Sequence, residues 1–590
     1  MTRLYLLAIV GVAGLLETWR LTINGWGNGY YAEAALAASR SWTALLTDAA
    51  DPSRLISLDK GPLPDWVLGL SARVFGFGSL SVLLPSVCCA VASVVLLYDA
   101  VRRLFGAQAG LLAAAMLACS PVSVMMGRYD NPDALLALLM TATAWAFVRW
   151  LESGKLRHLL LCGLFVGLGF NTKMFEVCLL VPGLAGAWLL VARRDVTRRL
   201  RDLAAAGAIA ASVGLAWYAT MTIIPAGSRP SVAESSSNSW AQLILSANGL
   251  QRVAGYGGGG AGPLRLFSRD MAGQAGWLMP LALLGLLVGL RVRDGAPGEA
   301  LRRAGVVMLG AWMLVGYGVF SFSKGAVHSY YTSAIAPAIA ALAAIAVVAV
   351  ARRARASAAA RTLLVGAVIV SALLGWLILG NTPGFVPWLR WLVLAAALIA
   401  SLALCLSSLE AGPRAQSLTA AVAACFASVA LLGGPLAYSV ATDGLGRSGA
   451  NPAAGPTSLV SPHGRAEGSF DPPLVGYLER HRAGARYLVA ATGSDFAAPI
   501  GLATRAPVIT LGGFQSTDIS PTVGQLAALV RSKQLRFILL TGRPASGAAV
   551  GRAGWVEAHC TRVSAPGIDE RTVGENGSPM RGPGSGLYRC

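Results

Sequence analysis

Long apolar runs recur along the whole chain and are separated by polar segments. A run of about 18 apolar residues is long enough to cross a bilayer as a helix, and only helices or closed barrels satisfy their backbone groups in lipid. The pattern therefore predicts a polytopic α-helical membrane protein with about 13 transmembrane helices. The predicted spans are 4–21, 82–101, 109–127, 133–150, 157–171, 175–192, 203–224, 271–290, 304–322, 332–350, 362–380, 388–406 and 417–438.

Two long polar loops and a polar tail interrupt this pattern. The loop 24–66 contains an amphipathic segment, 30–46, expected to lie at the membrane interface, and 63–76 is predicted to form a helix too short to cross. The second loop is 225–269, and the tail is 440–590. We predict a transmembrane domain, 1–439, followed by a small α/β domain, 440–590, because the tail contains strand-like segments. These are 486–491, 507–511 and 535–541, with a helix at 521–533 capped by Ser520 and starting with Pro521.

The distribution of charged residues predicts the orientation of the membrane domain. The net charge of +20 could suggest a nucleic-acid partner, but only 13% of residues are charged and 55% are hydrophobic. Basic residues follow every second predicted span, as the positive-inside rule requires of cytoplasmic loops. We therefore expect no nucleic acid, a cytoplasmic N-terminus and an extracytoplasmic C-terminal domain. The basic loop residues are Arg102, Arg103, Lys155, Arg157, Arg193 to Arg201, Arg291, Arg293, Arg302, Arg303, Arg352 to Arg361 and Arg414.

Cysteines do not form a metal-binding pattern. Seven of the nine lie in or beside predicted spans, where they are typical small core residues. Cys560 and Cys590 lie in the tail, which the predicted orientation exposes to an oxidising compartment. A Cys560–Cys590 disulfide is one interpretation, and two unpaired thiols are the other.

Four polar clusters fall on the predicted outer face. Charged groups this close to the membrane are costly and usually mark function, although ion pairs that only pack the helices are the alternative. Cations there could hold a phosphate, and a carboxylate could serve as the base for a sugar hydroxyl. The clusters are Glu33 with Asp59-Lys60; Arg128-Tyr129-Asp130-Asn131-Pro132-Asp133; Asn171-Thr172-Lys173 with Glu176; and Ser323-Lys324 with His328-Ser329-Tyr330-Tyr331.

The order of these motifs resembles the GT-C glycosyltransferases of family 39, which include the protein O-mannosyltransferases and the lipid A aminoarabinose transferase. Tyr31-Ala32-Glu33 resembles the Y-A-E of the family's first loop, and Asp59-Lys60-Gly61-Pro62 resembles its E-K-P-P. The corner 128–133 and the turn 323–331 resemble the second acidic corner and the late S-K…H-x-Y-Y turn. A bacterial mannosyltransferase-like branch shares Asn238-Ser239-Trp240, Asn248-Gly249-Leu250 and Gly512-Gly513-Phe514.

The resemblance implies a GT-C fold and an inverting enzyme that takes a sugar from a polyprenyl phosphate. Asp59, Asp130 or Glu33 would be the catalytic base, and the family's D-E pair is replaced here by Gly27-Asn28. The loop 225–269, with Asn238 and Trp240, would contact the acceptor, a cell-envelope glycan or lipid. The groups expected to hold the donor phosphate are Lys60, Arg128, Lys324, His328, Tyr330 and Tyr331.

No cofactor is required by this chemistry. A divalent cation would suit the hard oxygen ligands Asp130, Asp133 and Glu33, but the mechanism does not need one. The resemblance to the bacterial branch implies a location in a bacterial plasma membrane. Two other functions compete with it: a lipid or glycan transporter or flippase, and a non-catalytic scaffold that binds envelope glycan. A transporter favours charges at mid-membrane and internal repeats, whereas these acidic clusters lie at span ends.

Overall fold

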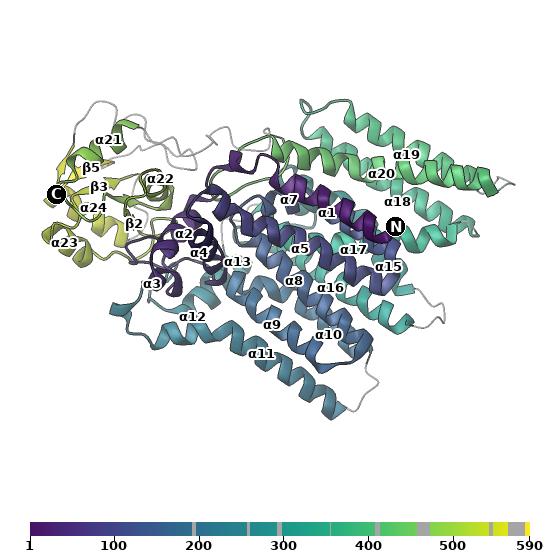
Figure 1. The fold of residues 1–590 in the computed structure, drawn as a ribbon, viewed down its shortest axis with the longest axis horizontal. Helices are drawn as coiled ribbons and strands as arrows, with labels where there is room; N and C mark the ends of the chain where they lie inside the picture. The colour runs from purple at the N-terminus through teal and green to yellow at the C-terminus, as the bar shows by residue number, and fades with distance from the viewer. Residues whose placement is uncertain are drawn as a thin grey trace.

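A bundle of long helices makes up most of the protein, and a small α/β domain sits at one end of it beside α2 and α4 (Figure 1). The structure, a computed structural model, describes residues 1–191, 196–255, 260–291, 298–354, 356–407, 413–456, 472–541, 547–563 and 585–590. Several basic residues of the predicted cytoplasmic loops, Arg193 and Arg293 among them, lie outside these ranges.

Eleven helices of the described residues are long and apolar enough to cross a membrane, or up to twelve if the bent pair α6–α7 is one span. This establishes the polytopic helical class that the apolar runs predicted. The bundle helices are α1 Thr2–Thr18, α5 Ser79–Phe105, α6 Ala107–Ala118, α7 Pro121–Gly127, α8 Asp133–Ser153, α9 Leu156–Lys173, α10 Val181–Leu190, α11 Val196–Ile223, α14 Arg269–Ala275, α15 Met279–Arg291, α16 Glu299–Phe322, α17 Ala336–Ala354, α18 Ala358–Gly380, α19 Leu389–Leu406 and α20 Pro413–Asp443.

One of these spans, the 35-residue run Leu156–Leu190, contains two passes. Gly163 of α9 packs on the Ala206 carbonyl of α11, and Gly167 packs on that of Ala210, so the two helices run parallel. The segment between two consecutive parallel helices must return to the starting side. The chain turns at Met174, which has a positive φ of 48°, and the 3₁₀ helix η2 (Met174–Leu180) begins there. The sequence divides its fifth and sixth predicted spans at this place.

The first long loop folds into three short helices, α2 Gly29–Arg40, α3 Trp42–Leu46 and α4 Leu63–Phe75. Asn28 caps α2 by accepting a hydrogen bond from Tyr30 N, and Ser41 caps α3 in the same way from Ala44 N. The expectation of one interfacial helix over 30–46 is wrong. All ten residues 29–38 are buried because α4 and the C-terminal helix α22 cover α2.

The C-terminal domain is built on a five-stranded sheet of order β2-β1-β3-β5-β4. Strands β1 Ala490–Thr492, β2 Ile509–Leu511 and β3 Phe537–Leu540 are parallel, with Ala490 opposite both Ile509 and Ile538. Strands β4 Thr561–Arg562 and β5 Gly586–Arg589 add an antiparallel edge that the sequence did not indicate. The helices are α21 Pro472–His481, α22 Ser494–Thr504, α23 Val523–Arg531 and α24 Gly547–His559.

Two details of this domain bear on the predictions from sequence. The cap of α23 is Thr522, which forms a capping box with Gln525, and not Ser520. A two-sided capping box satisfies two backbone donors at once, and this sets the start of the helix two residues later than predicted. Cys560 and Cys590 are joined in a disulfide bond.

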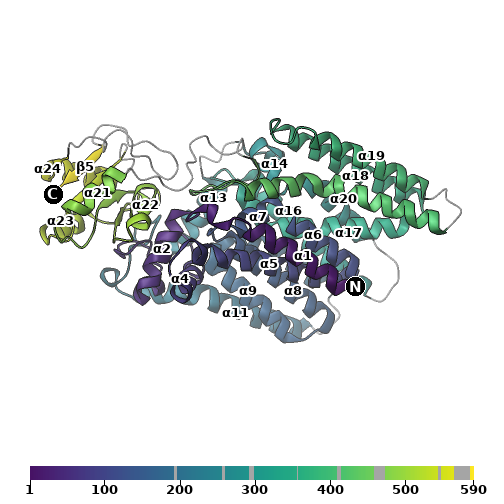
Figure 2. The same ribbon diagram turned by 45° about the horizontal axis from the view of Figure 1, so that its top comes forward.

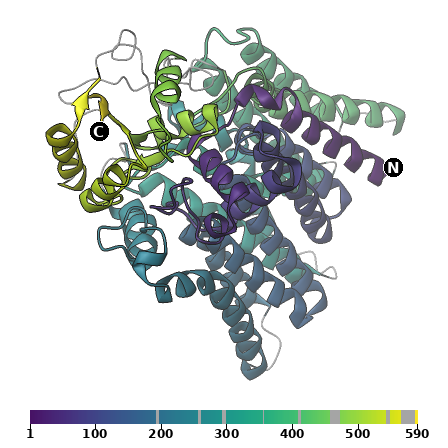
Figure 3. The same ribbon diagram turned by 60° about the vertical axis from the view of Figure 1, so that its left-hand side comes forward.

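The C-terminal domain is fastened to the first loop by one buried and one exposed hydrogen bond. Asp51 Oδ2 accepts from Thr510 N at 2.8 Å, and Arg40 donates to the Arg505 carbonyl at 2.7 Å. Figures 2 and 3 show the domain against α2, at the end of the bundle away from the N-terminus. We call this end of the bundle the loop face.

Candidate active site

Two cavities meet at the loop face. The first, the apolar cavity, has a volume of about 630 Å³ and lies between η2, the end of α16 and the π-helical segment η4 (Leu243–Leu250). The second, the polar cavity, has a volume of about 320 Å³ and is enclosed by the first loop, the turn 326–331 and the C-terminal domain. Lys60, Arg252 and Tyr331 line both cavities, so two cations and a phenol stand at their junction.

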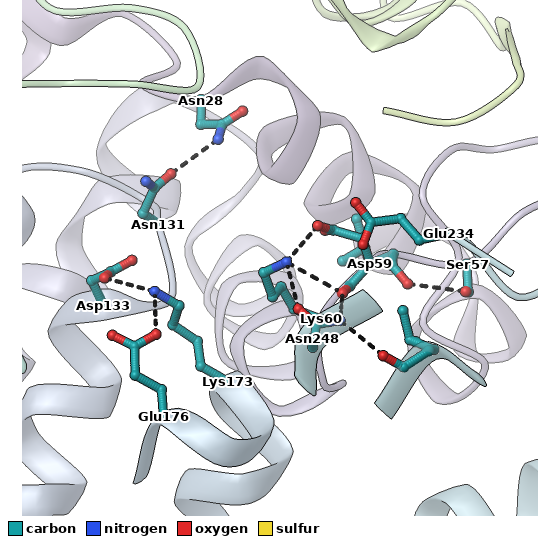
Figure 4. A network of polar contacts seen from close by, with 12 residues as sticks. Asn28, Ser57, Asp59, Lys60, Asn131, Asp133, Lys173, Glu176, Glu234 and Asn248 are labelled. Carbon is teal, nitrogen blue, oxygen red and sulfur yellow. Dashed lines mark hydrogen bonds and ion pairs between the residues drawn. The ribbon is translucent and has the colours of Figure 1, made fainter. Parts of the chain in front are cut away.

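Lys60 and Asp59 are fixed by the loop that carries them. Lys60 Nζ lies 2.5 Å from Asp59 Oδ2 and 3.1 Å from Asn248 Oδ1, while Asn248 Nδ2 donates to the Asp59 carbonyl at 2.9 Å (Figure 4). Gly61 follows them and packs on the Asn171 carbonyl, where a Cβ would collide. Asp59 Oδ1 is buried and has no hydrogen-bond partner among the described residues. One carboxylate oxygen is thus held by Lys60, and the other is available to a ligand.

Arg252 lies on α13 (Gln251–Ala254) and is half-buried. The helix is held by the turn 323–327, because Lys324 N donates to the Val253 carbonyl at 2.9 Å and Gly325 packs on the Gln251 carbonyl. The neighbouring Tyr331, more than any other group, raises the pKa of Arg252, and burial opposes this shift. Arg252 therefore stays cationic, and no carboxylate of the described residues lies within ion-pair distance of it.

Three aromatic rings close the junction. His328 stacks on Tyr330 with ring centroids 5.4 Å apart, and Tyr331 stands edge-on to both. Burial, followed by the charge of Arg252, lowers the pKa of His328 to about 4. The imidazole is therefore neutral near pH 7, and can donate or accept a hydrogen bond there without adding a positive charge.

A second charged cluster lies beside Tyr331, and two of its residues, Lys173 and Glu176, line the apolar cavity. Lys173 Nζ is 2.9 Å from Asp133 Oδ1 and 2.8 Å from Glu176 Oε2, and it stands 4.1 Å from the centre of the Tyr331 ring (Figure 4). Two carboxylates thus hold one ammonium, and the ammonium in turn supports the ring. Asp133 and Lys173, which the sequence placed in separate clusters, form one network with Glu176.

The structure places several predicted site residues away from the cavities. Arg128 is fully buried, with its guanidinium donating to the Leu16 carbonyl at 2.9 Å and lying 3.4 Å from Asp443. It ties α7 to α1 and α20 and lines neither cavity. Asp130 Oδ1 accepts a hydrogen bond from Asn28 N at 2.7 Å.

Glu33 is also displaced from its predicted role. Its carboxylate packs against Gly501 of α22, where an added Cβ would come within 2.6 Å of Oε1. Glu33 and Asp130 line neither cavity, whereas Asp59 lines the polar one. The three proposed metal ligands Glu33, Asp130 and Asp133 thus have separate partners, and no group of three or more acidic, histidine or cysteine side chains of the described chain could hold a metal ion.

Corrections also apply to Lys324, Asn238 and Trp240. The Lys324 side chain is exposed and lines neither cavity; its contribution to the site is the backbone bond that holds α13. Asn238 Oδ1 accepts from Val232 N and braces its own loop, and Trp240 packs in a buried cluster with Trp217. Neither residue lines the polar cavity.

The sequence missed Arg252, Asn248 and Glu234 as site residues. Glu234 lines the polar cavity, and Figure 4 shows it beside the Asp59–Lys60 pair. Burial raises the pKa of Glu234, and the charge of Asp59 adds to the shift. The sequence did contain a signal for these residues. A carboxylate, an amide and a cation occur together in the outer loop 225–269, and these are groups that can bind a phosphate and a sugar.

Comparisons with known proteins agree with this geometry. Residues 59–217 match the family model described as "Dolichyl-phosphate-mannose-protein mannosyltransferase", and residues 474–559 match "Putative mannosyltransferase YkcB-like, C-terminal". The chain is 26% identical to "Putative mannosyltransferase YkcB" of Bacillus subtilis, over 95% of this chain and 91% of that protein. It is 27% identical to the undecaprenyl phosphate-alpha-4-amino-4-deoxy-L-arabinose arabinosyl transferase of Edwardsiella ictaluri, over 46% of this chain and 47% of that protein.

A solved structure shares the fold. The crystal structure of ArnT from Cupriavidus metallidurans bound to undecaprenyl phosphate superposes with a TM-score of 0.57 and 15% identity, covering 99% of this chain and 97% of that one. The family match begins at Asp59, the residue that opens the Asp59-Lys60 motif at the cavity junction. The chain therefore has the fold of the GT-C membrane glycosyltransferases, and its sequence is similar to the mannosyltransferases and arabinosyl transferases named above.

Proposed function

We propose that this glycosyltransferase moves a sugar from a polyprenyl phosphate to a hydroxyl of a cell-envelope glycan or lipid, with inversion at the anomeric carbon. One observation carries the proposal: an apolar cavity and a polar cavity meet at Lys60, Arg252 and Tyr331. A polyprenyl-phosphate sugar has the same three parts in the same order, a hydrocarbon chain, an anion and a polyhydroxylated ring.

The apolar cavity would take the first isoprene units of the lipid. It is lined largely by aliphatic and aromatic side chains, and its size falls in the usual range of ligand pockets. Leu245, Leu250 and Phe175 line it and are also partly exposed on the outside of the bundle. Exposed apolar side chains at a cavity rim suit lateral arrival of a lipid from the bilayer.

Lys60, Arg252 and Tyr331 would hold the phosphate. Charge-assisted hydrogen bonds to phosphate are about twice as strong as neutral ones, and arginine can make two in parallel. As the bond from the anomeric carbon to the phosphate oxygen breaks, negative charge grows on that oxygen, and fixed cations stabilise it. Arg252 replaces Arg128 and Lys324 in the role that the sequence assigned to them.

Asp59 is the proposed base, with Glu234 as the second candidate. Asp59 Oδ1 is free of hydrogen bonds among the described residues and belongs to a residue that lines the polar cavity. Glu234 lines the same cavity, and its raised pKa brings it closer to the neutral range in which a general base works best. The base would take the acceptor proton as the hydroxyl oxygen attacks the anomeric carbon opposite the phosphate. No divalent cation is required for this step.

The reaction would take place on the outer face of a bacterial plasma membrane. The support is the alternation of basic loops in the sequence, which places the loop face and the C-terminal domain outside and the N-terminus inside.

The test is a transfer assay with the purified protein in nanodiscs. Labelled polyprenyl-phosphate sugars are supplied one at a time with an envelope extract, and the anomeric configuration of the product is determined. Asp59→Asn and Glu234→Gln run in parallel, with Asp270→Asn, an exposed carboxylate outside both cavities, as the matched control. Loss in one cavity variant alone identifies the base. Label that stays on the lipid for every sugar, or a product of retained configuration, would overturn the proposal.

A further inference from the structure

The C-terminal domain forms a wall of the polar cavity opposite the membrane helices. Its lining residues come from short segments far apart in the sequence: Thr492, Asp495, Phe514, Gln515, Ser516 and Thr541. Each segment lies at or just beyond the carboxyl end of one of the three parallel strands, β1, β2 or β3. The wall is therefore the carboxyl edge of a parallel sheet, where open α/β sheets place their ligands.

The strand order makes a crevice at this edge. β1 lies between β2 and β3. The connection after β1 therefore runs to β2 on one side of it, and the connection after β2 crosses to β3 on the other side. Thr492 Oγ1 bridges the crevice by donating to the Leu539 carbonyl at 3.2 Å and accepting from Thr541 N at 3.4 Å. Gly493 has a φ of +71°, and a Cβ there would come within 2.6 Å of Ser516 Oγ. The turn that brings Asp495 to the cavity thus needs glycine.

This edge is held against the first loop and the loop 225–239 by side-chain contacts. The Phe514 ring packs on Tyr30 with centroids 5.1 Å apart, and Glu234 N donates to Asp518 Oδ1 at 2.8 Å. Together with the Asp51–Thr510 bond, these contacts fix the first loop, the loop 225–239 and the sheet as one body. A group bound at the Lys60–Arg252 junction and projecting into the polar cavity must meet this wall.

We infer that the carboxyl edge of the C-terminal sheet binds the sugar of the lipid-linked donor and selects a neutral or amino sugar over a uronic acid. The inference rests on the proposed function, since it takes the phosphate-linked sugar as the occupant. The carboxylate of Asp495 and the amide of Gln515 match ring hydroxyls. The Tyr30–Phe514 pair offers an aromatic surface to the C–H face of the ring.

Charge decides the class of sugar. Of the described residues that line the polar cavity, only Lys60 and Arg252 are cationic at neutral pH, and the donor phosphate uses both. The carboxylates of Asp59 and Glu234 line the remaining space. A second anion on the sugar would face these carboxylates without a counter-ion, and like charges at close range suppress binding. A hydroxyl or an ammonium group meets no such opposition.

The experiment measures binding as well as transfer, so that the two proposals can fail separately. Affinities of the full-length protein in nanodiscs are determined for undecaprenyl phosphate, undecaprenyl-phosphate mannose and undecaprenyl-phosphate glucuronic acid. Asp495→Asn and Gln515→Ala are compared with Glu479→Gln, which removes an exposed carboxylate of the same domain outside the cavity. The melting temperature of each variant checks that the domain remains folded.

We expect the wild type to bind the mannosyl lipid more tightly than the bare lipid phosphate, and the glucuronosyl lipid more weakly than the mannosyl lipid. Asp495→Asn and Gln515→Ala should lower affinity for the mannosyl lipid by about tenfold while leaving the bare lipid unchanged, as loss of one hydrogen bond to a ligand predicts. Equal loss for both lipids, no loss for either, or a preference for the uronic acid would overturn the inference. Absence of transfer with this binding pattern intact would refute the proposed reaction but not the sugar site.

Discussion

Removing the Arg252 guanidinium should cost more activity than removing any other single cation of the loop face except Lys60. In Arg252→Met, the phosphate loses two charge-assisted hydrogen bonds from a half-buried group that no described carboxylate neutralises. Loss of one fixed donor to a developing anion lowers kcat by about a hundredfold to a thousandfold. Arg252→Lys keeps the charge but loses the two-pronged geometry, so it should recover only part of this loss.

The assay is the initial rate of sugar transfer in nanodiscs at saturating acceptor. Lys324→Met is the matched control, because it removes a basic side chain on the turn that holds α13 while leaving the backbone bond from Lys324 N to Val253 intact. It should transfer at the wild-type rate. The reasoning would be refuted if Arg252→Met stayed within about threefold of wild type, or if Lys324→Met lost as much, since a factor of a hundred corresponds to nearly 3 kcal/mol of barrier.

Further predictions concern pH, docking and the tight turn. If Glu234 is the base, kcat/KM should fall as pH is lowered through a value above 4.5, because the raised pKa protonates the carboxylate there, and Glu234→Gln should abolish that limb of the profile. Asp51→Ala leaves Thr510 N buried without its acceptor and should lower the free energy of unfolding of the docked domain by about 1–3 kcal/mol, measured by thermal melting and by proteolysis. Gly61→Ala should reduce both yield and activity because its Cβ collides with the Asn171 carbonyl, whereas Gly476→Ala meets open space and serves as the control.

The membrane architecture was predictable because each span carries its own signal. A hydrophobic run is a local property, and the basic loops alternate with the spans independently of packing. The same holds for the Asp59-Lys60 motif, which lies in a short turn beside the end of α9. Even the reversal at Met174, which a count by helix length passes over, was visible as a polar break between two apolar runs.

Roles that depend on long-range packing could not be predicted in this way. Arg128 and Arg252 look alike in the sequence, because each is an arginine in a predicted outer polar segment. Arg128 is buried because α1, at the start of the chain, and α20, the last helix of the bundle, pack over it. Arg252 reaches the cavity because the turn 323–327 holds α13 in place. The sheet edge was likewise invisible, since which end of the strands faces the membrane depends on the docking contacts of Asp51 and Arg40.

The ion pair between Lys60 and Asp59 couples donor binding to base release in the proposed reaction. Before the donor arrives, the ammonium lies 2.5 Å from Asp59 Oδ2 and holds that carboxylate in place. A phosphate at the junction competes for the same ammonium, so its arrival loosens the hold on Asp59 and turns the carboxylate toward the acceptor's proton. Removing the Lys60 ammonium should therefore impair two steps at once, donor binding and proton removal. Lys60→Met should for this reason lower kcat even at saturating donor. Substitution of a residue that only binds the lipid chain, such as Leu245, should instead change KM alone.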